Sequence, residues 1–172
     1  MREGMKKQKT LVYGLIAGSA TIGYFLLFYF IQPRLFFSLS VQWASLLIFI
    51  GFMVLAVRNG RRLAGEGQYP WQLGLRAAFT VYVLAAMMYH LFYFLLYNYG
   101  APELASIQEE VLMENLTRYK DVVGERNAEN LQRDIRQTGI ALTPGTALMA
   151  LARSIIGGFV LSLIIGYLMR KE

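Results

Sequence analysis

The polar side chains with the clearest chemical potential lie in an otherwise apolar run, "MMYHLFYFLLYNY". His90 is the only histidine in the chain, and Tyr93 and Tyr97 follow it by three and seven residues, on roughly the same face of a helix. An ionisable group inside a membrane-spanning helix often marks a substrate or ion pathway. The three residues predict either a polar strip that could line a pathway or contact a ligand, or a neutral histidine hydrogen-bonded to a neighbouring helix.

Arg153 is the other charged residue to consider, because it lies about a turn inside the last apolar run, "ALARSIIGGFVLSLIIGYLMRKE". A buried arginine is costly in lipid, but one near a helix end can extend its guanidinium to the interface. We therefore weigh interfacial anchoring against pairing with an acid such as Glu103, or contact with an anionic head group or ligand. In the last case Arg153 joins His90, Tyr93 and Tyr97 as a candidate for the polar pathway or ligand contact.

Catalytic and metal chemistry find little support in the sequence. The chain has no cysteine, which excludes disulfides, thiolate metal sites and cysteine nucleophiles. Acid–base catalysis needs paired carboxylates in a cleft, whereas the Asp and Glu residues here all lie in tails and loops. A lone histidine is a poor metal site, and "GEG" in the second link is too short for a phosphate loop. We expect a protein that is not an enzyme, with no catalytic residue, metal site or cofactor.

Small residues recur at every fourth position of the last apolar run: Ala150, Ser154, Gly158, Ser162 and Gly166. Positions four apart drift by only about 40° on an α-helix, so these residues form one slowly winding groove. Gly14 and Gly18 form a shorter ridge of the same kind in the first run. Lipid gives helices little hydrophobic reason to associate, so packing relies on close approach at small side chains. The two ridges predict helix packing, within one bundle or against a partner or second copy. A pore lined by small residues is the third alternative.

Composition places these residues in a membrane. Hydrophobic residues make up 56% of the chain and charged residues 16%, against roughly 25% charged in soluble domains. The apolar surplus falls in four blocks, and a soluble chain of this size could not cover so much apolar surface. We predict a single all-α membrane domain over 1–172, a bundle of four transmembrane helices with spans at about 11–31, 40–57, 73–97 and 144–169.

The ends of the spans carry local signals. The first apolar run is about twice as long as a signal-peptide core, so we expect it to be retained as a span. Trp43 lies near the start of the second span, where an aromatic ring can lie at head-group level. The link 58–72 is rich in arginine and glycine and is predicted as a loop. Thr143 and Pro144 are typical of a helix N-cap followed by proline at the first helical position.

The segment 101–141 between the third and fourth spans is the only long polar region, and it shows helical periodicity. Its apolar positions recur every three or four residues: Leu104, Ile107, Val111, Leu112, Leu116, Tyr119 and Val123. Gly124 is expected to break this amphipathic helix, and a second, shorter helix is expected to end near Gly139. Helices that lie on lipid are typically basic on their polar face. Because this one is acidic, we expect it to pack as a helical cap.

The distribution of charge predicts the orientation. Lys and Arg cluster in the N-terminal tail, in the link 58–72 and at the C-terminus, whereas acids outnumber bases in the segment 101–141. The positive-inside rule then places both termini in the cytoplasm and the segment 101–141 outside. The net charge of +6 follows the span ends and not one helix face, so no nucleic-acid partner is expected.

Two stretches carry a resemblance to a known family: "FIGFMVLAVRNGRRLAGEGQYPWQLGLRAAFTVYVLAAMMYHLFYFLLYNY" and the closing "GGFVLSLIIGYLMRKE". The order of the parts resembles DUF4199, a family of small four-pass bacterial inner-membrane proteins of unknown function. In that order, a basic, Gly-rich link precedes a span ending in aromatics, and a polar helical segment and a last span with a terminal basic pair follow. Trp71 stands where a phenylalanine would be more usual. The resemblance implies the four-span fold and the bacterial inner membrane, and it transfers no catalytic residue.

From these patterns we expect an accessory or structural membrane subunit, or an oligomeric scaffold. Its expected partners are membrane lipids and a protein partner or further copies of itself. The small faces of the first and fourth spans and the apolar stripe of the polar segment would carry this role. The alternative is a component for small-solute or ion transport formed by an oligomer, with His90, Arg153 and the tyrosines of the third span lining the path.

Overall fold

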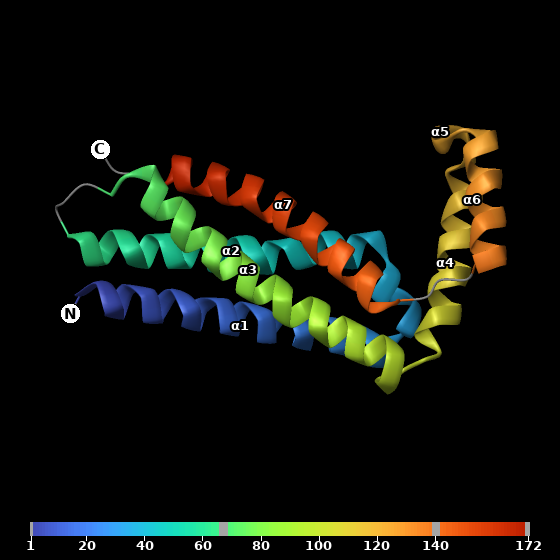
Figure 1. Ribbon diagram of the computed structural model, residues 1–172, viewed down its shortest axis with the longest axis horizontal. Coiled ribbons are helices and arrows are strands. Elements are labelled where there is room, and N and C mark those ends of the chain that lie inside the picture. The colour runs from blue at the N-terminus through green and yellow to red at the C-terminus, as the bar shows by residue number, and fades with distance from the viewer. Residues whose placement is uncertain (1, 66–68, 139–141, 171–172) are drawn as a thin grey trace.

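The computed structural model describes residues 2–65, 69–138 and 142–170, and over these residues the fold is all-α without a β-strand. Figure 1 shows four long helices running along the molecule: α1 (Arg2–Ile31), α2 (Leu39–Ala64), α3 (Trp71–Leu95) and α7 (Pro144–Leu168). Each contains a stretch long and apolar enough to cross a membrane. The predicted four-span bundle is confirmed, and the chain is a multi-pass membrane protein.

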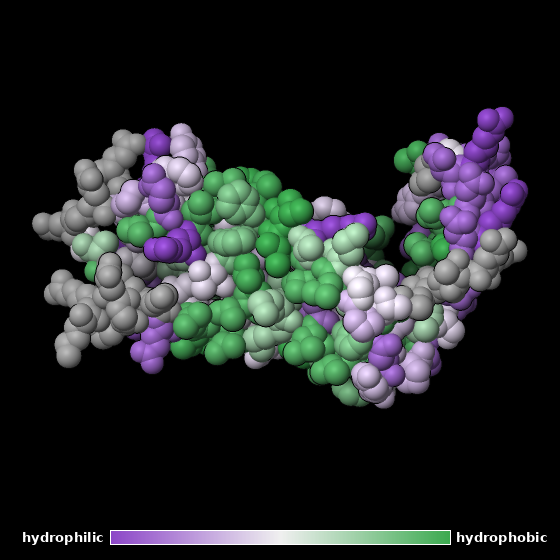
Figure 2. All heavy atoms as spheres, in the orientation of Figure 1, coloured by the Kyte–Doolittle hydropathy of each residue, from purple (hydrophilic) through white to green (hydrophobic). Residues whose placement is uncertain are grey.

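Apolar side chains cover the middle of the bundle. Figure 2 shows this apolar belt between two more polar ends. Large side chains in the spans are widely exposed, including Leu47 (70%), Leu148 (65%) and Ile156 (68%). Such a continuous apolar surface would be a liability in water, whereas it matches the acyl chains of a bilayer.

The helix α3 is the centre of the bundle, since it packs against α1, α2 and α7. Its inward face is made of small and branched side chains, and Ala78, Val81 and Ala85 are fully buried. Met53 and Val57 of α2 complete this core. Small residues on α3 allow its neighbours to approach closely, which is how helices gain contact energy in lipid.

A second buried cluster lies at the end of the bundle away from the chain termini. The link after α1 forms a 3-10 helix, η1 (Pro33–Phe37), and α3 ends in a π-turn, η2 (Leu96–Gly100). Phe36 of η1 and Tyr97 of η2 pack with Phe25 of α1 in this cluster. The link after the first span is therefore a packed corner and not merely a short connection.

The polar segment forms a helical hairpin at this same end: α4 (Leu104–Arg118), the short α5 (Lys120–Val123) and α6 (Glu125–Thr138). Figure 1 shows the hairpin standing across the long axis of the bundle. Gly124 has φ of +87°, a conformation that glycine adopts without strain, and α6 begins directly after it. The predicted helical segment and its break at Gly124 are confirmed. The predicted end near Gly139 lies outside the described residues.

The helix α2 is longer than predicted, because the residues "RNGRRLA" (58–64) are helical and not part of a loop. Arg61 and Arg62 lie in the last turn, where positive charge is stabilised by the helix dipole. The helix ends at Gly65, whose φ of +68° is typical of a C-terminal stop. The prediction of a loop from Arg58 is wrong, since the chain leaves the apolar layer there without leaving the helix.

The start of α7 is as predicted. The side-chain oxygen of Thr143 accepts a hydrogen bond from the backbone N–H of Thr146 at 3.2 Å, and Pro144 is the first helical residue. The cap satisfies one of the free N–H groups at the helix start. It fixes where the fourth span begins.

Candidate functional site

The inner half of the small-residue groove on α7 packs directly against α3. A Cβ atom on Gly166 would lie 2.6 Å from the backbone nitrogen of Leu75 and 3.0 Å from the carbonyl oxygen of Trp71. A Cβ on Gly74 would in turn lie 3.1 Å from the Cα of Gly166. The two backbones therefore touch where a glycine of each helix faces the other, a contact that no larger residue would allow.

Further along α7, the groove receives an aromatic ring. The ring of Tyr82 on α3 occupies the place where a Cβ on Gly158 would be. Its hydroxyl lies 2.8 Å from the side-chain oxygen of Ser154, and the hydroxyl of Ser162 donates to the carbonyl oxygen of Gly158 at 2.6 Å. Each polar group of this buried contact is thereby paired, as the interior of a membrane protein requires.

The outer half of the groove leaves α3. Ser154 is half-buried and Ala150 is exposed, whereas Gly158, Ser162 and Gly166 are buried. Arg153 is exposed as well. It lies five residues before Gly158, which is about 140° around the helix, so it faces away from α3. Over the described residues, Arg153 forms no ion pair or hydrogen bond.

The ridge on α1 also packs against α3. A Cβ on Gly14 would lie 2.9 Å from the Cβ of Leu84, and one on Gly18 would lie 2.7 Å from the sulfur of Met88. Thr21, one turn further, is fully buried and donates its hydroxyl to a backbone carbonyl of α1. Small residues of both α1 and α7 are therefore used to bring these helices onto α3.

The structure brings Tyr93 and Tyr97 together in a packed aromatic ladder, and His90 meets this ladder through the ring of Tyr89. Nδ1 of His90 lies 2.8 Å from the carbonyl oxygen of Ala86 and donates to it, since a carbonyl can only accept. The ring centroids of Tyr93 and Tyr97 are 5.8 Å apart, and Tyr97 is buried. Tyr93 stacks on Phe36 of η1 with centroids 5.7 Å apart.

Tyr93 also reaches the hairpin. Its hydroxyl donates to the side-chain oxygen of Gln108 on α4 at 3.3 Å. The two tyrosines therefore join the bundle to the hairpin, while Arg153 lies on another helix and faces outward. No hydrogen bond among the described residues links Arg153 to the other three candidates.

With this geometry defined, comparison with known proteins identifies a family. The family described as "Protein of unknown function (DUF4199)" matches residues 12–171, which cover the hairpin and nearly all of the four spans. The chain belongs to this family. No curated protein and no solved structure matches the chain. The resemblance seen in the sequence is confirmed.

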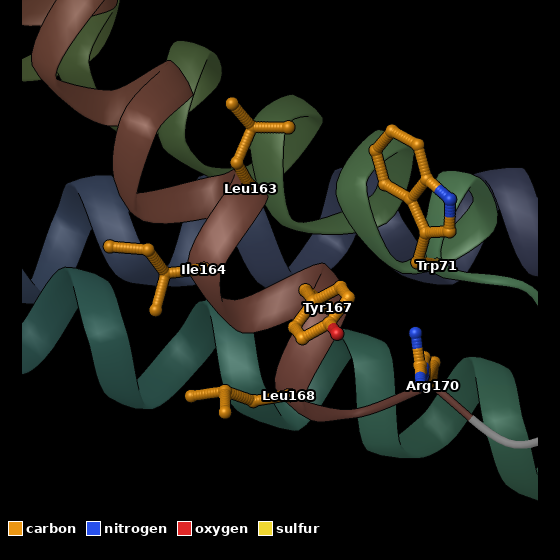
Figure 3. A pocket seen from close by; sticks show the side chains of 6 residues that line it. All are labelled: Trp71, Leu163, Ile164, Tyr167, Leu168 and Arg170. Atoms are coloured by element: carbon orange, nitrogen blue, oxygen red, sulfur yellow. The ribbon is translucent and has the colours of Figure 1, made fainter.

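In this DUF4199 protein the close crossing of α3 and α7 borders an open groove of about 580 Å³. Figure 3 shows its six lining residues: Trp71, Leu163, Ile164, Tyr167, Leu168 and Arg170. Trp71 lies at the start of α3, whereas Arg170 directly follows the end of α7. The groove therefore lies at the end of the bundle that carries the arginines of the span ends.

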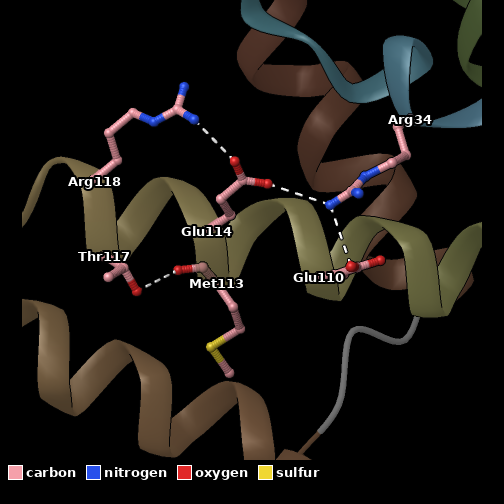
Figure 4. Close-up of polar contacts among 6 residues, drawn as sticks. All are labelled: Arg34, Glu110, Met113, Glu114, Thr117 and Arg118. Carbon is pink, nitrogen blue, oxygen red and sulfur yellow. Dashed lines mark hydrogen bonds and ion pairs between the residues drawn. The ribbon is translucent and has the colours of Figure 1, made fainter.

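Arg34 joins the bundle to the hairpin through contacts that the sequence did not single out. Figure 4 shows its guanidinium between two acids of α4, at 3.2 Å from Glu110 and 3.3 Å from Glu114. Glu114 also pairs with Arg118 at 2.9 Å. Exposed pairs contribute about 0–1 kcal/mol each, so their main effect is to fix the direction of the hairpin. Glu110 and Glu114 lie four positions apart on one face of α4, but nothing in the sequence links them to Arg34.

Three arginines surround a second, smaller hollow of about 360 Å³ at the end of α2: Arg58, Arg61 and Arg62, with Gly65. The hydroxyl of Tyr69 lies over Gly60, 2.5 Å from where its Cβ would be. Burial raises the pKa of the Tyr69 hydroxyl, while the nearby Arg61 lowers it. Within the ranges that the structure describes, no group of three or more His, Cys, Asp or Glu is arranged to hold a metal ion.

Proposed function

We propose that the protein is an accessory membrane subunit that binds a transmembrane helix of a different protein along the outward face of α7. In this proposal the basic end of the bundle lies in the cytoplasm of a bacterial cell, and the hairpin lies on the other side of the inner membrane. The clustering of Lys and Arg at the end that carries both termini supports this orientation.

The observation that carries the proposal is Arg153, a charged side chain exposed on a span and directed away from the rest of the bundle. Facing lipid, a charge at the bilayer centre costs about 2.5–3.5 kcal/mol on insertion scales. Movement of the guanidinium toward the interface reduces that cost, and a carboxylate on a neighbouring helix would remove more of it. The presence of an arginine at this position therefore supports a partner helix that carries a negative charge.

The side chains around Arg153 suit a neighbouring helix. Thr146, Ala150, Arg153 and Gly157 follow at intervals of four, three and four residues, so they lie on one face. Apart from Gly157 itself, its two neighbours and the adjacent backbone of α7, no atom of the described chain lies within 4 Å of where a Cβ on Gly157 would be. A second helix could therefore approach the backbone of α7 there, as small residues permit in lipid.

The absence of acids from the spans favours a different protein over a second copy. The four candidate spans contain no Asp or Glu in their sequences. A second copy packed against α7 would bring no carboxylate from its own spans to Arg153. A homo-oligomer is thus the less favoured form of the predicted scaffold.

The hairpin adds a surface outside the apolar layer. Its tip exposes Val122 (84%) and Tyr119 (44%), and Leu131 on α6 is 46% exposed. Tyr93 and Arg34 hold α4 against the bundle, so this surface keeps a fixed direction. A partner with a soluble region could contact the hairpin and α7 together.

The transport alternative has less support. Tyr93 and Tyr97 pack among aromatic rings and against α4, and Arg153 faces outward from a different helix. A path through an oligomer would need these groups around one opening. Ion or solute flux through vesicles that contain the purified protein, lost in both His90→Ala and Arg153→Ala, would favour transport over an accessory role.

Site-directed cross-linking tests the accessory role, and it is clean because the chain has no native cysteine. A benzophenone label on Gly157→Cys, in native membranes, should give an adduct with a protein that has Asp or Glu in a span. The adduct should fall at least several-fold when Arg153→Leu is added. Leu47→Cys on α2 is the control, since it is equally lipid-facing at 70% exposure but carries no neighbouring charge.

The outcome has three forms. An acid-bearing adduct that depends on Arg153 supports the proposal. An adduct of twice the mass of the chain would assign the face to a second copy and overturn it. Equal labelling from Gly157→Cys and Leu47→Cys would show that α7 faces lipid alone, and would overturn it as well.

A further inference from the structure

The groove between α3 and α7 at the basic end has two chemically distinct ends. Figure 3 shows Leu163, Ile164 and Leu168 toward one end, and Trp71 and Arg170 at the other, with Tyr167 between them. One end is therefore purely aliphatic, and the other offers an indole N–H and a guanidinium as donors. A long apolar tail with a polar head group has the same division.

The close crossing of the helices creates this groove. Gly74 and Gly166 bring the two backbones together, so the side chains that follow Gly166 on α7 must turn outward. Tyr167 (56%) and Leu168 (74%) are accordingly exposed, beside Trp71 of α3. The volume of about 580 Å³ is in the usual range for ligand sites, roughly 300–1,000 Å³.

The polar end of the groove is preorganised for an anion. The guanidinium carbon of Arg170 lies 4.5 Å from the centre of the Tyr167 ring. This is a cation–π contact, and a guanidinium has five N–H donors, more than one partner can use. Arginine pairs strongly with phosphate because the edge can donate two parallel hydrogen bonds.

The surroundings are positively charged as well. Arg58, Arg61 and Arg62 at the end of α2 lie at the same end of the bundle as Arg170, and Arg76 is one turn into α3. Basic pockets between transmembrane helices are a usual place for the head groups of anionic lipids. The positive charge disfavours a neutral lipid, and the aliphatic lining disfavours a free anion. Together they favour an anionic lipid.

We infer that this groove is a binding site for one anionic phospholipid. An acyl chain lies along Leu163, Ile164 and Leu168, and the phosphate accepts hydrogen bonds from Arg170 and the indole of Trp71. This site is separate from the proposed partner helix, since Arg153 lies ten residues, nearly three turns, before Leu163, the first residue of the groove along α7. It can be tested on the purified protein alone.

Quenching of tryptophan fluorescence by brominated lipids tests the site. The chain has two tryptophans, so a Trp43→Phe variant leaves Trp71 as the only fluorophore. In phosphatidylcholine vesicles, brominated phosphatidylglycerol should quench Trp71 with about a fivefold preference over brominated phosphatidylcholine, the factor expected for one arginine near a lipid phosphate. Arg170→Gln should remove most of this preference and Arg170→Lys should retain part of it.

Two controls separate this site from general attraction to a basic surface. Arg62→Gln lies at the same end but outside the groove, and should keep the preference. In a Trp71→Phe variant, the remaining Trp43 at the start of α2 should show no preference. Equal quenching of Trp71 by the two lipids, or an unchanged preference in Arg170→Gln, would overturn the inference. Loss of the preference on adding glycerol phosphate to the buffer would overturn it in favour of a soluble anion.

Discussion

The hydroxyl of Tyr82 on α3 lies 2.8 Å from the side-chain oxygen of Ser154 on α7, with the tyrosine ring laid across Gly158. This contact lies where the small-residue groove of α7 leaves α3. Below it, Ser162 and Gly166 are buried against α3, whereas above it Ala150 is exposed. A single tyrosine thus marks the boundary between the part of α7 that holds the bundle together and the part that faces outward.

Replacing Gly158 with leucine should destabilise the bundle. The new side chain would occupy the place of the Tyr82 ring, which is itself held against Phe49 with ring centroids 5.2 Å apart. Overpacking of this kind costs about 1–3 kcal/mol. Gly157→Leu is the matched control one position earlier, where the space is open. Thermal unfolding in mild detergent should show a lower midpoint for Gly158→Leu only; equal midpoints would contradict the packing of α7 on α3.

The two glycine ridges should tolerate alanine differently. A Cβ at Gly166 meets backbone atoms of α3, whereas a Cβ at Gly18 meets only side-chain atoms of Met88: the sulfur, which can rotate away, and the Cβ at 3.0 Å. Gly166→Ala should therefore lower the unfolding midpoint clearly, and Gly18→Ala should lower it less. The reverse order would mean that α1, and not α7, makes the tightest backbone contact with α3.

Arg34→Gln should loosen the hairpin without unfolding the spans. It removes both contacts to Glu110 and Glu114, which are exposed and together contribute about 0–2 kcal/mol. Faster amide hydrogen exchange in α4, with unchanged exchange in α3, is the expected readout. Lys120→Gln, at the far tip of the hairpin, is the control and should leave the start of α4 unaffected. Unchanged exchange in α4 would show that aromatic packing alone holds the hairpin.

The tip of the hairpin should respond to pH through Lys120 and Glu125, whose charged atoms are 2.9 Å apart. The hydrogen bond from Lys120 lowers the pKa of Glu125 below its usual 4.5, so this stabilisation is present above pH 4.5 and is lost as the pH falls through the lowered pKa. The same bond raises the pKa of Lys120 above its usual 10.5, so that contribution is lost only as the pH rises through the raised value. The protection factors of the α6 amides, which correct for the intrinsic pH dependence of exchange, should fall at both extremes, and Lys120→Gln should flatten this dependence.

How far the sequence predicts the structure depends on the range of the interactions. Span positions follow from local hydropathy, and the cap at Thr143 and the break at Gly124 follow from local backbone chemistry. Local sequence does not predict which way each small-residue face points. Ala150 and Gly158 are equivalent by sequence, and only the structure shows that Tyr82 lies opposite Gly158. Gly74, Ala78 and Tyr82 also recur at every fourth position, a signal on α3 that matches the groove on α7.

The candidate polar residues show the same limit. The spacing of His90, Tyr93 and Tyr97 predicts a shared face. The structure joins Tyr93 to Tyr97, whereas His90 contacts Tyr89, and the side chains that cover the two tyrosines come from segments far away in sequence. Phe36 stacks on Tyr93 and Gln108 accepts its hydrogen bond, so the predicted polar strip is a packed contact between the bundle and the hairpin. Arg34 and Glu114 are eighty positions apart, so no local pattern could pair them.

Replacing Arg153 with leucine should raise the stability of the isolated protein in bilayer nanodiscs. Arg153 makes no polar contact within the described residues, so nothing in the bundle is lost, while a charge facing lipid costs up to about 2.5–3.5 kcal/mol at the bilayer centre. Arg76→Leu, at the basic end of α3 where the guanidinium reaches water, should change the unfolding midpoint less. A fall in stability like that of Gly158→Leu would make Arg153 a structural contact of the bundle. A rise, together with loss of the cross-link from Gly157→Cys, would mean that the charge is kept at the expense of stability because another helix uses it.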